Sequence, residues 1–231
     1  MGGADYAYEP DRSWRGKIRR RAVRAAGRTA VGRTAERPIV TFSFDDAPLT
    51  AATSGATALE RRGVTGTFYL SAGLGGTSGP MGPILDAGTA RQLSEAGHEL
   101  ACHTYTHLDC GQARGEQALD DVRQNAQAFE SWGLPRPTNF AYPYGDVSAR
   151  CKTALAPGFD TMRGLHHGIV SRRSDRHQLP AVGLEGADAL TVGRMWIDRL
   201  VDRGGWLILY THDVDRDPSP WGCDPDVFEE L

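Results

Sequence analysis

Short apolar runs alternate with amphipathic stretches along most of this 231-residue chain. The apolar runs are rich in β-branched and aromatic residues, which favours buried strands. Strands are predicted at 39–44, 66–70, 98–102, 139–142, 159–162, 178–184 and 206–210. Helices are predicted at 51–62, 89–96, 116–132, 148–156 and 189–201. Because strands that alternate with helices form strand–helix–strand units, the sequence predicts a parallel sheet.

About seven such units favour a closed or nearly closed sheet over an open one. We therefore predict an α/β fold, a distorted (β/α) barrel with about seven parallel strands. The chain divides into a basic N-terminal arm, 1–37, and a main domain, 38–231. A helical turn that opens near Asp226 stops at Leu231, so we expect the domain to be truncated at its C-terminus.

The N-terminal arm holds ten basic residues and one acidic residue between Arg12 and Arg37. We expect a helix docked on the domain by Trp14, Ile18 and Val23, with its arginines outward. The alternative is an arm that binds anionic lipid or nucleic acid. Nothing aromatic interleaves the arginines, as strand-binding grooves require, so no nucleic-acid partner is expected.

Composition narrows the class of protein. The mean hydropathy of -0.42 excludes a polytopic membrane protein, and no window approaches the roughly 20 apolar residues of a spanning helix. The basic run is not followed by the apolar stretch of a signal peptide, so we expect a cytoplasmic protein, with a membrane-peripheral one as the alternative. The four cysteines form no CxxC motif and are expected to be free thiols.

Chemically competent side chains follow four of the predicted strands. They are Asp45 and Asp46, His103 and His107, the segment from Tyr142 to Asp146, and His212 with Asp213. The carboxyl ends of parallel strands in a barrel meet at one face, where active sites lie, so these residues are expected to share one pocket.

The individual pieces have ordinary alternatives. An Asp-Asp pair after a strand can cap a helix, although adjacent like charges beside an apolar strand are unfavourable unless a cation separates their roles. The spacing of His103 and His107 suits two ligands of one ion, and it also arises by chance. An Asp with two His leaves open positions for water and substrate, the layout of a catalytic metal site. His98 is expected to be structural.

Four segments, in order, resemble the motifs of the NodB-homology polysaccharide deacetylases, carbohydrate esterase family four. Residues 41–48 (TFSFDDAP) are similar to the first motif and 97–107 (GHELACHTYTH) to the second. Residues 140–145 (FAYPYG) are similar to the third and 207–213 (LILYTHD) to the last. The combination is specific, although no single motif is.

The resemblance implies a barrel with fewer strands than eight and one divalent ion, with zinc expected. Its ligands would be three side chains: Asp46, His103 and His107. Asp45 would be the general base, and His212 the general acid that protonates the departing amine. The backbone N–H of Tyr144 would stabilise the oxyanion.

Two departures from the family pattern concern the base and the acid. Ala141 stands where the third motif usually begins with an arginine that orients the base, and Arg163 or Arg150 could replace it. The acidic-aromatic fourth motif is absent, and a carboxylate beside His212 could come from three candidates, which are Asp213, Asp175 and Asp160.

We therefore expect a metal-dependent hydrolase that removes an N-acetyl group from an amino-sugar glycan or its oligosaccharide precursor. One alternative is a hydrolase of a small linear or cyclic amide, and another is a glycan-binding protein without catalysis. Rim aromatics would favour a glycan, and Tyr105, Tyr142 and Trp221 are the candidates, together with the loop of His166 and His167.

Overall fold

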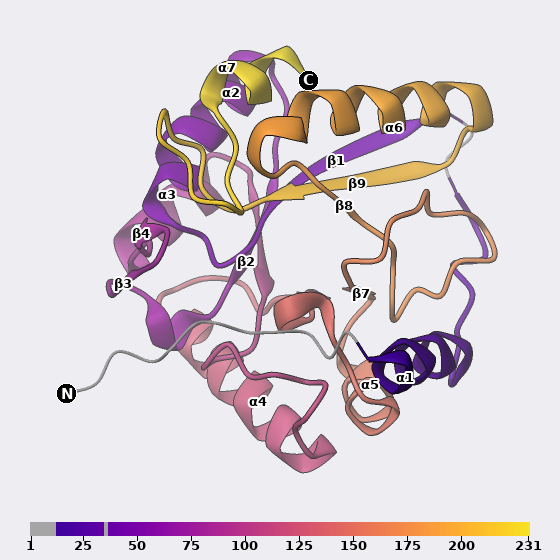
Figure 1. Ribbon diagram of the computed structural model, residues 1–231. Coiled ribbons are helices and arrows are strands. Elements are labelled where there is room, and N and C mark those ends of the chain that lie inside the picture. Colours follow the sequence, from indigo (N-terminus) through magenta and orange to yellow (C-terminus); the bar gives the residue numbers. More distant parts are fainter. Residues whose placement is uncertain (1–12, 35–36) are drawn as a thin grey trace.

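The computed structural model describes residues 13–34 and 37–231 (Figure 1). Its main sheet has seven strands in the order β7-β6-β5-β2-β1-β9-β8, and every pair of neighbours is parallel. The strands are β1 (Ile39–Phe44), β2 (Thr67–Leu70), β5 (Glu99–Cys102), β6 (Asn139–Ala141), β7 (Thr161–Arg163), β8 (Val182–Gly183) and β9 (Trp206–Thr211). The sheet curls into an incomplete barrel, which confirms the predicted fold. In the described ranges only an isolated bridge, Arg163 to Leu179, lies beyond the β7 edge.

Helices cover the outside of the curled sheet (Figure 1). They are α1 (Trp14–Ala25), α2 (Ala56–Arg61), α3 (Ala87–Glu95), α4 (Gly115–Ser131), α5 (Ala149–Leu155), α6 (Ala189–Arg203) and α7 (Pro225–Glu230). A π-helical turn, Ala51–Gly55, leads into α2. The glycine-rich segment that follows β2 contains a small antiparallel hairpin, β3 (Ser78–Gly79) and β4 (Gly82–Pro83). The described ranges contain no helix with both the length and the hydropathy needed to cross a membrane.

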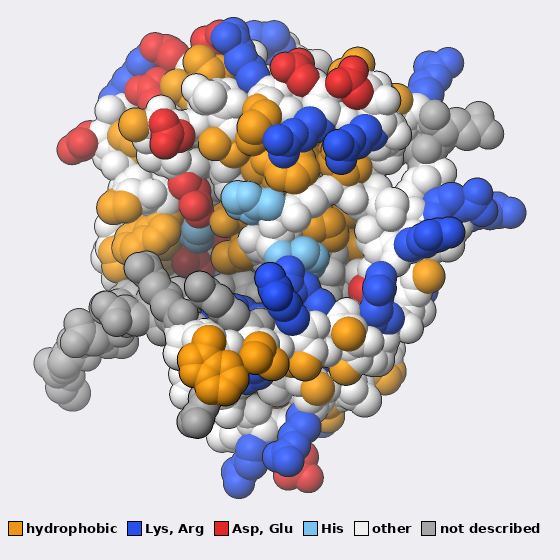
Figure 2. Space-filling model, turned by 45° about the vertical axis from the view of Figure 1, so that its right-hand side comes forward, with side chains coloured by type: hydrophobic (Ala, Val, Ile, Leu, Met, Phe, Trp, Pro, Cys, Tyr) orange, Lys and Arg blue, Asp and Glu red, His pale blue; other side chains and the backbone are white. Residues whose placement is uncertain are grey.

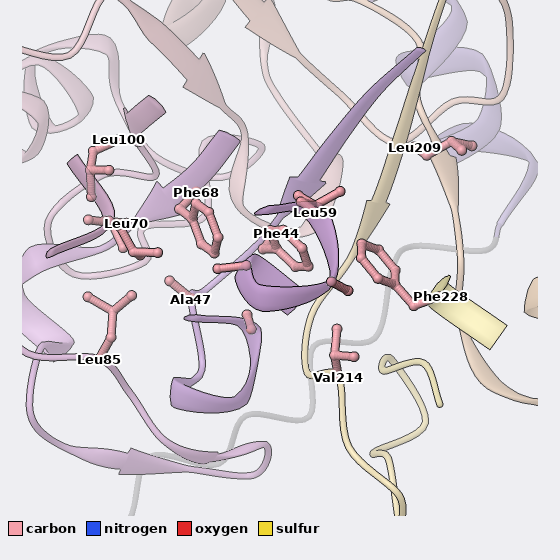
Figure 3. Close-up of a cluster of buried hydrophobic side chains, with 14 of the residues drawn as sticks. Phe44, Ala47, Leu59, Phe68, Leu70, Leu85, Leu100, Leu209, Val214 and Phe228 are labelled. Atoms are coloured by element: carbon pink, nitrogen blue, oxygen red, sulfur yellow. The ribbon is translucent and has the colours of Figure 1, made fainter. Parts of the chain in front are cut away.

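The largest core cluster lies around β1 and β2 and includes side chains of α2, α3 and α7 (Figure 3). Phe44 is fully buried and stacks on Phe68, with 4.6 Å between ring centroids. Phe228 of α7 packs against Phe42 and Phe44 from the other side, at 5.4 and 5.5 Å. Burial of each such ring stabilises the fold by about 1.5–3 kcal/mol. The core therefore fixes β1, whose C-terminal end carries Asp45 and Asp46.

The N-terminal helix docks by polar contacts, and the expected apolar docking is wrong for two of its three residues. Trp14 and Ile18 are 67% and 56% exposed, and only Val23 is buried. Lys152 of α5 donates to the carbonyls of Val23 and Ala26, at 3.1 and 2.9 Å. These carbonyls belong to the last turn of α1 and its cap, where the helix itself leaves carbonyls without partners. Residues 1–12 and 35–36 of the expected arm lie outside the described residues.

Lys152 also pairs with a buried carboxylate, so it joins three parts of the chain. Its Nζ lies 2.5 Å from Asp175 Oδ2, and both side chains are nearly inaccessible to solvent. Asp175 in turn accepts the backbone N–H of Thr29, at 3.0 Å. The same ammonium group thus holds α1, α5 and the segment around Asp175 together.

We predict that Lys152→Met lowers the free energy of unfolding by about 3 kcal/mol, because Asp175 is left buried without its cation. Denaturant unfolding measures the change, and Arg150→Ala, at an exposed position of the same helix, is the control. The double variant Lys152→Met/Asp175→Asn recovers part of the loss. A Lys152→Met protein as stable as the wild type would contradict this account.

Candidate active site

The strand ends bring the six predicted site residues to one pocket of about 300 Å³. Its lining includes Asp45, Asp46, His103, His107, Tyr144 and His212. The walls are largely apolar and include residues of the β3–β4 hairpin together with Leu165 and Trp221. In Figure 2, acidic and histidine side chains are visible deep in a hollow of the surface. A pocket of this size lies at the lower end of the range for small-ligand sites, which is roughly 300–1,000 Å³.

Asp46, His103 and His107 are close enough to hold one metal ion. Asp46 Oδ1 lies 3.4 Å from His103 Nε2 and 3.1 Å from His107 Nε2. One ligand atom of each residue falls within 4.8 Å of the others. Asp46 Oδ1 is also buried without a hydrogen-bond partner among the described residues, a costly state that a cation would relieve. The donor set therefore fits a divalent ion of the zinc type.

Burial and hydrogen bonding keep His103 neutral and Asp46 ionised, the forms in which they can bind a metal ion. His103 Nδ1 donates to the carbonyl of Ala141 at 2.8 Å, which leaves the Nε2 lone pair for a metal. Burial lowers the pKa of His103 to about 4, against the opposing effect of the Asp45 charge, so the ring is neutral at pH 7. Burial alone would raise the pKa of Asp46, but the His107 and His103 imidazoles outweigh it, and the pKa lies well below its ordinary value.

Left-handed backbone conformations gather at this pocket. In the described ranges, positive φ at non-glycine residues occurs at five positions: Asp46 (58°), Ala47 (45°), Thr104 (63°), His107 (57°) and Tyr144 (58°). Such conformations are strained for residues with a Cβ and persist only where the surroundings impose them. Two of the candidate ligands and the candidate oxyanion residue are among the five. The strain therefore marks the place where the chain turns back from the strand ends to aim its functional groups.

A buried carboxylate on α4 holds the loop between His103 and His107. Asp121 accepts the backbone N–H groups of Tyr105 and Thr106, at 2.5 and 3.0 Å, and the Thr106 hydroxyl at 2.8 Å. The hydroxyl of Thr104 accepts the N–H of Leu108 at 2.8 Å. The sequence did not indicate a role for Asp121, because a charged residue within an amphipathic helix is expected to face solvent.

Arg163 supplies the guanidinium partner of Asp45. Its Nη2 donates to Asp45 Oδ1, and both side chains are almost completely buried. The guanidinium lies between two aromatic rings, 4.6 Å from the centroid of Tyr69 and 5.2 Å from that of Tyr210. Burial alone would lower the pKa of Arg163, but the charge of Asp45 outweighs it and raises the pKa. Of the two sequence candidates, the structure selects Arg163 rather than Arg150.

The register of the sheet explains how Arg163 can replace a residue at position 141. Ala141 of β6 and Arg163 of β7 are directly paired neighbours in adjacent strands. Ala141 is fully buried beside Tyr69 and Ala101, and its small side chain takes up little of the space inside the curl. The guanidinium can therefore start one strand further out and still reach Asp45.

The carboxylate beside His212 is Glu185, not any of the three candidates from the sequence. Glu185 Oε1 lies 3.8 Å from His212 Nδ1. Burial raises the pKa of Glu185, although the charge of His212 opposes the shift. Asp175 is instead paired with Lys152, and Asp213 accepts the backbone N–H and the hydroxyl of Ser219. Asp160 does not line the pocket.

Glu185 directly follows the predicted strand 178–184. The expectation that residues after the strands meet in one pocket therefore applies to Glu185 as well.

Two of the three expected rim aromatics lie elsewhere. Trp221 lines the pocket and is 43% exposed. Tyr142 is buried, and its hydroxyl donates to the carbonyl of His177 at 3.0 Å. Tyr105 packs against the main core cluster. His98 is structural, as predicted: its Nδ1 accepts the N–H of Gly66 at 3.0 Å. The four cysteines are free and buried.

Comparison with known proteins identifies the family. The family model described as polysaccharide deacetylase matches residues 32–158, more than half of the chain, so the chain belongs to the polysaccharide deacetylase family. A peptidoglycan-N-acetylglucosamine deacetylase of Bacillus cereus is 29% identical over 126 residues, which are 54% of this chain and 55% of that protein. A bifunctional xylanase/deacetylase of Pseudobutyrivibrio xylanivorans is 28% identical over 119 residues, 50% of this chain and 18% of that protein. The chain thus spans about half of the first protein and less than a fifth of the second.

Solved structures of polysaccharide deacetylases and related proteins have a similar fold. IcaB from Ammonifex degensii superimposes with a TM-score of 0.60 at 20% identity, over 68% of this chain and 71% of that one. A family 4 carbohydrate esterase from Streptomyces lividans, solved with acetate, gives a TM-score of 0.54 at 22% identity, over 84% and 86%. At these identities the likeness establishes the fold alone.

We predict that Arg163→Ala lowers the free energy of unfolding by about 3 kcal/mol, because it leaves Asp45 buried without a cation. Adding Ala141→Arg to that variant returns a guanidinium to the register-paired position and recovers part of the loss. Ala141→Arg alone, which overfills a buried position beside the resident arginine, destabilises. Denaturant unfolding of the three variants measures whether a guanidinium at position 141 can replace the one at position 163. A neutral Arg163→Ala, or a double variant no more stable than it, would rule out this exchange of positions.

Proposed function

We propose that this protein is a metal-dependent hydrolase that removes an N-acetyl group from an amino-sugar glycan or its oligosaccharide precursor. The observation that carries the proposal is the division of labour between adjacent carboxylates. Asp46 faces His103 and His107 with an unpartnered oxygen, whereas Asp45 faces away toward Arg163. One carboxylate is thus available as a ligand and the other as a base. Membership of the polysaccharide deacetylase family supports the same reaction.

Asp46, His103 and His107 would hold the ion. A bound divalent ion supplies Lewis-acid chemistry, which polarises a carbonyl oxygen and makes water more acidic. Asp45, held by Arg163, accepts a proton from the attacking water at its free oxygen. The N–H of Tyr144, aimed by a left-handed backbone, donates to the oxygen that gains charge. His212 protonates the amide nitrogen as acetate and a free amine separate.

The Arg163–Asp45 pair favours catalysis over binding alone. Ala141 and the missing fourth motif would favour a glycan-binding protein without catalysis. Arg163 pairs with Asp45, and Glu185 lies 3.8 Å from His212, so the candidate base and the candidate acid each have a charged neighbour. A site that only bound a glycan would have no use for a buried carboxylate and a histidine that line the same pocket as three candidate metal ligands.

The two aspartates test the proposal. Asp45→Asn keeps the metal ligands and is expected to lower kcat by at least about a hundredfold, the usual size of a general-base contribution, with metal content unchanged. Asp46→Asn is expected to lose metal and activity together. Elemental analysis and acetate release from N-acetylglucosamine oligomers, beside small linear and cyclic amides, are the measurements. Equal metal loss in both variants would make Asp45 a ligand, and turnover of the small amides alone would select the small-amide alternative.

The pair of Glu185 and His212 predicts a role for Glu185 in the acid step. Glu185 Oε1 lies 3.8 Å from His212 Nδ1, close enough to orient the imidazole. Glu185→Gln removes the carboxylate and is expected to lower kcat by roughly tenfold, the lower end of the effect of losing such an orienting partner. The isosteric amide preserves packing, and metal content serves as the control. An unchanged kcat would separate Glu185 from the acid step.

A further inference from the structure

A groove leads away from the candidate active site along α1. Tyr144 and Leu165 line both the active-site pocket and the start of the groove. We define the arginine groove by its basic and imidazole side chains: Arg20, Arg24, Arg28, His166 and His167. Its inner part has a volume of about 270 Å³ and its outer part about 290 Å³, and the two share Arg24, His166 and Gln178. Figure 2 shows Lys and Arg side chains directly beside histidines on this face. A substituent of a molecule bound at the metal site could therefore extend into this groove.

The positive charges of the groove are not balanced by the acids that line it. Asp146 is paired with Arg19 at 2.6 Å, and Asp175 with Lys152 at 2.5 Å, so each acid already has a cation. Within residues 13–34 and 37–231, the three arginines of the groove form no ion pair with a carboxylate. Arg28 donates to a backbone carbonyl, that of Arg173, at 2.6 Å.

Arg20 and Arg24 both line the inner part of the groove. They are four residues apart on one helix face, where like charges repel. An oxyanion bound between the two guanidinium groups would relieve this repulsion and accept their hydrogen bonds.

His166 contributes a hydrogen-bonding group without adding charge. Burial lowers its pKa to about 4, and the charge of Arg24 lowers it further, against the opposing charge of Asp175. The imidazole is therefore neutral at pH 7 and can donate one hydrogen bond to an oxyanion. Arginines with a neutral imidazole suit phosphate, whose oxygens match the guanidinium fork.

We propose that the arginine groove binds a phosphate group of the substrate. The substrate class is then a phosphorylated amino sugar, with its acetamide at the metal site and its phosphate beside Arg20 and Arg24. This inference rests on the proposed function for the identity of the sugar, while the groove itself stands on its own residues. Sugar recognition and phosphate recognition would share Tyr144 and Leu165 as their boundary.

The test compares N-acetylglucosamine 1-phosphate with neutral N-acetylglucosamine. Calorimetry on the metal-loaded protein measures both affinities, and a titration of chelator-treated protein is the control for phosphate that binds at the metal ion. The phosphorylated sugar is expected to bind at least about tenfold more tightly, the size of one charge-assisted hydrogen bond. The double variant Arg20→Ala/Arg24→Ala abolishes that preference. Arg21→Ala, an exposed arginine of the same helix that does not line the groove, retains it.

Three results would overturn the inference: equal binding of the two sugars by the wild type, a preference that survives the double variant, or an equal loss in Arg21→Ala. Thermal unfolding of each variant, with Arg20→Gln/Arg24→Gln as a second pair, separates loss of the site from loss of the fold. Acetate release from neutral oligomers with no phosphate preference would remove this inference and leave the proposed function. A phosphate preference without acetate release from either sugar would do the reverse.

Discussion

The guanidinium of Arg163 reaches Asp45 across the inside of the curled sheet. Arg163 ends β7 at the edge of the sheet, and Asp45 follows β1, with β6, β5 and β2 between them in the strand order. Only a sheet that curls back on itself can bring these two strand ends into contact. Small side chains at Ala101 and Ala141 leave the interior open, and Tyr69 and Tyr210 flank the cation. The ion pair therefore depends on the fold and gives the site its orientation.

With Asp45 held in this way, its neighbour is free for a different partner. Asp46 has a left-handed backbone, which turns its carboxylate away from Asp45 and toward His103 and His107. His107 has the same backbone conformation, in a loop that Asp121 holds from α4. The local strain at these residues is sustained by the buried sheet and by helix-borne hydrogen bonds. Stability elsewhere in the molecule thus maintains a geometry that the loop residues alone would not adopt.

The sequence was sufficient for whatever depends on local pattern. Alternation of apolar runs predicted the strands of the sheet, and the strand-end rule predicted that Asp46, His103 and His107 would meet. Features that depend on pairing between distant segments could not be predicted from the sequence. Arg163 replaces the missing arginine because β6 and β7 pair in a particular register, and the sequence could only name it beside Arg150. The docking of α1 was misread because the contacts to Val23 and Ala26 are backbone carbonyls, which carry no sequence signal.

The central claim is that two adjacent aspartates have separate roles, one as a metal ligand and one as a base held by an arginine. Anomalous diffraction from crystals grown with zinc tests it most directly. We expect one peak coordinated by Asp46, His103 and His107, with Asp45 outside the coordination sphere and still bonded to Arg163. A peak coordinated by both carboxylates, or a zinc ion bound away from these three side chains, would contradict it.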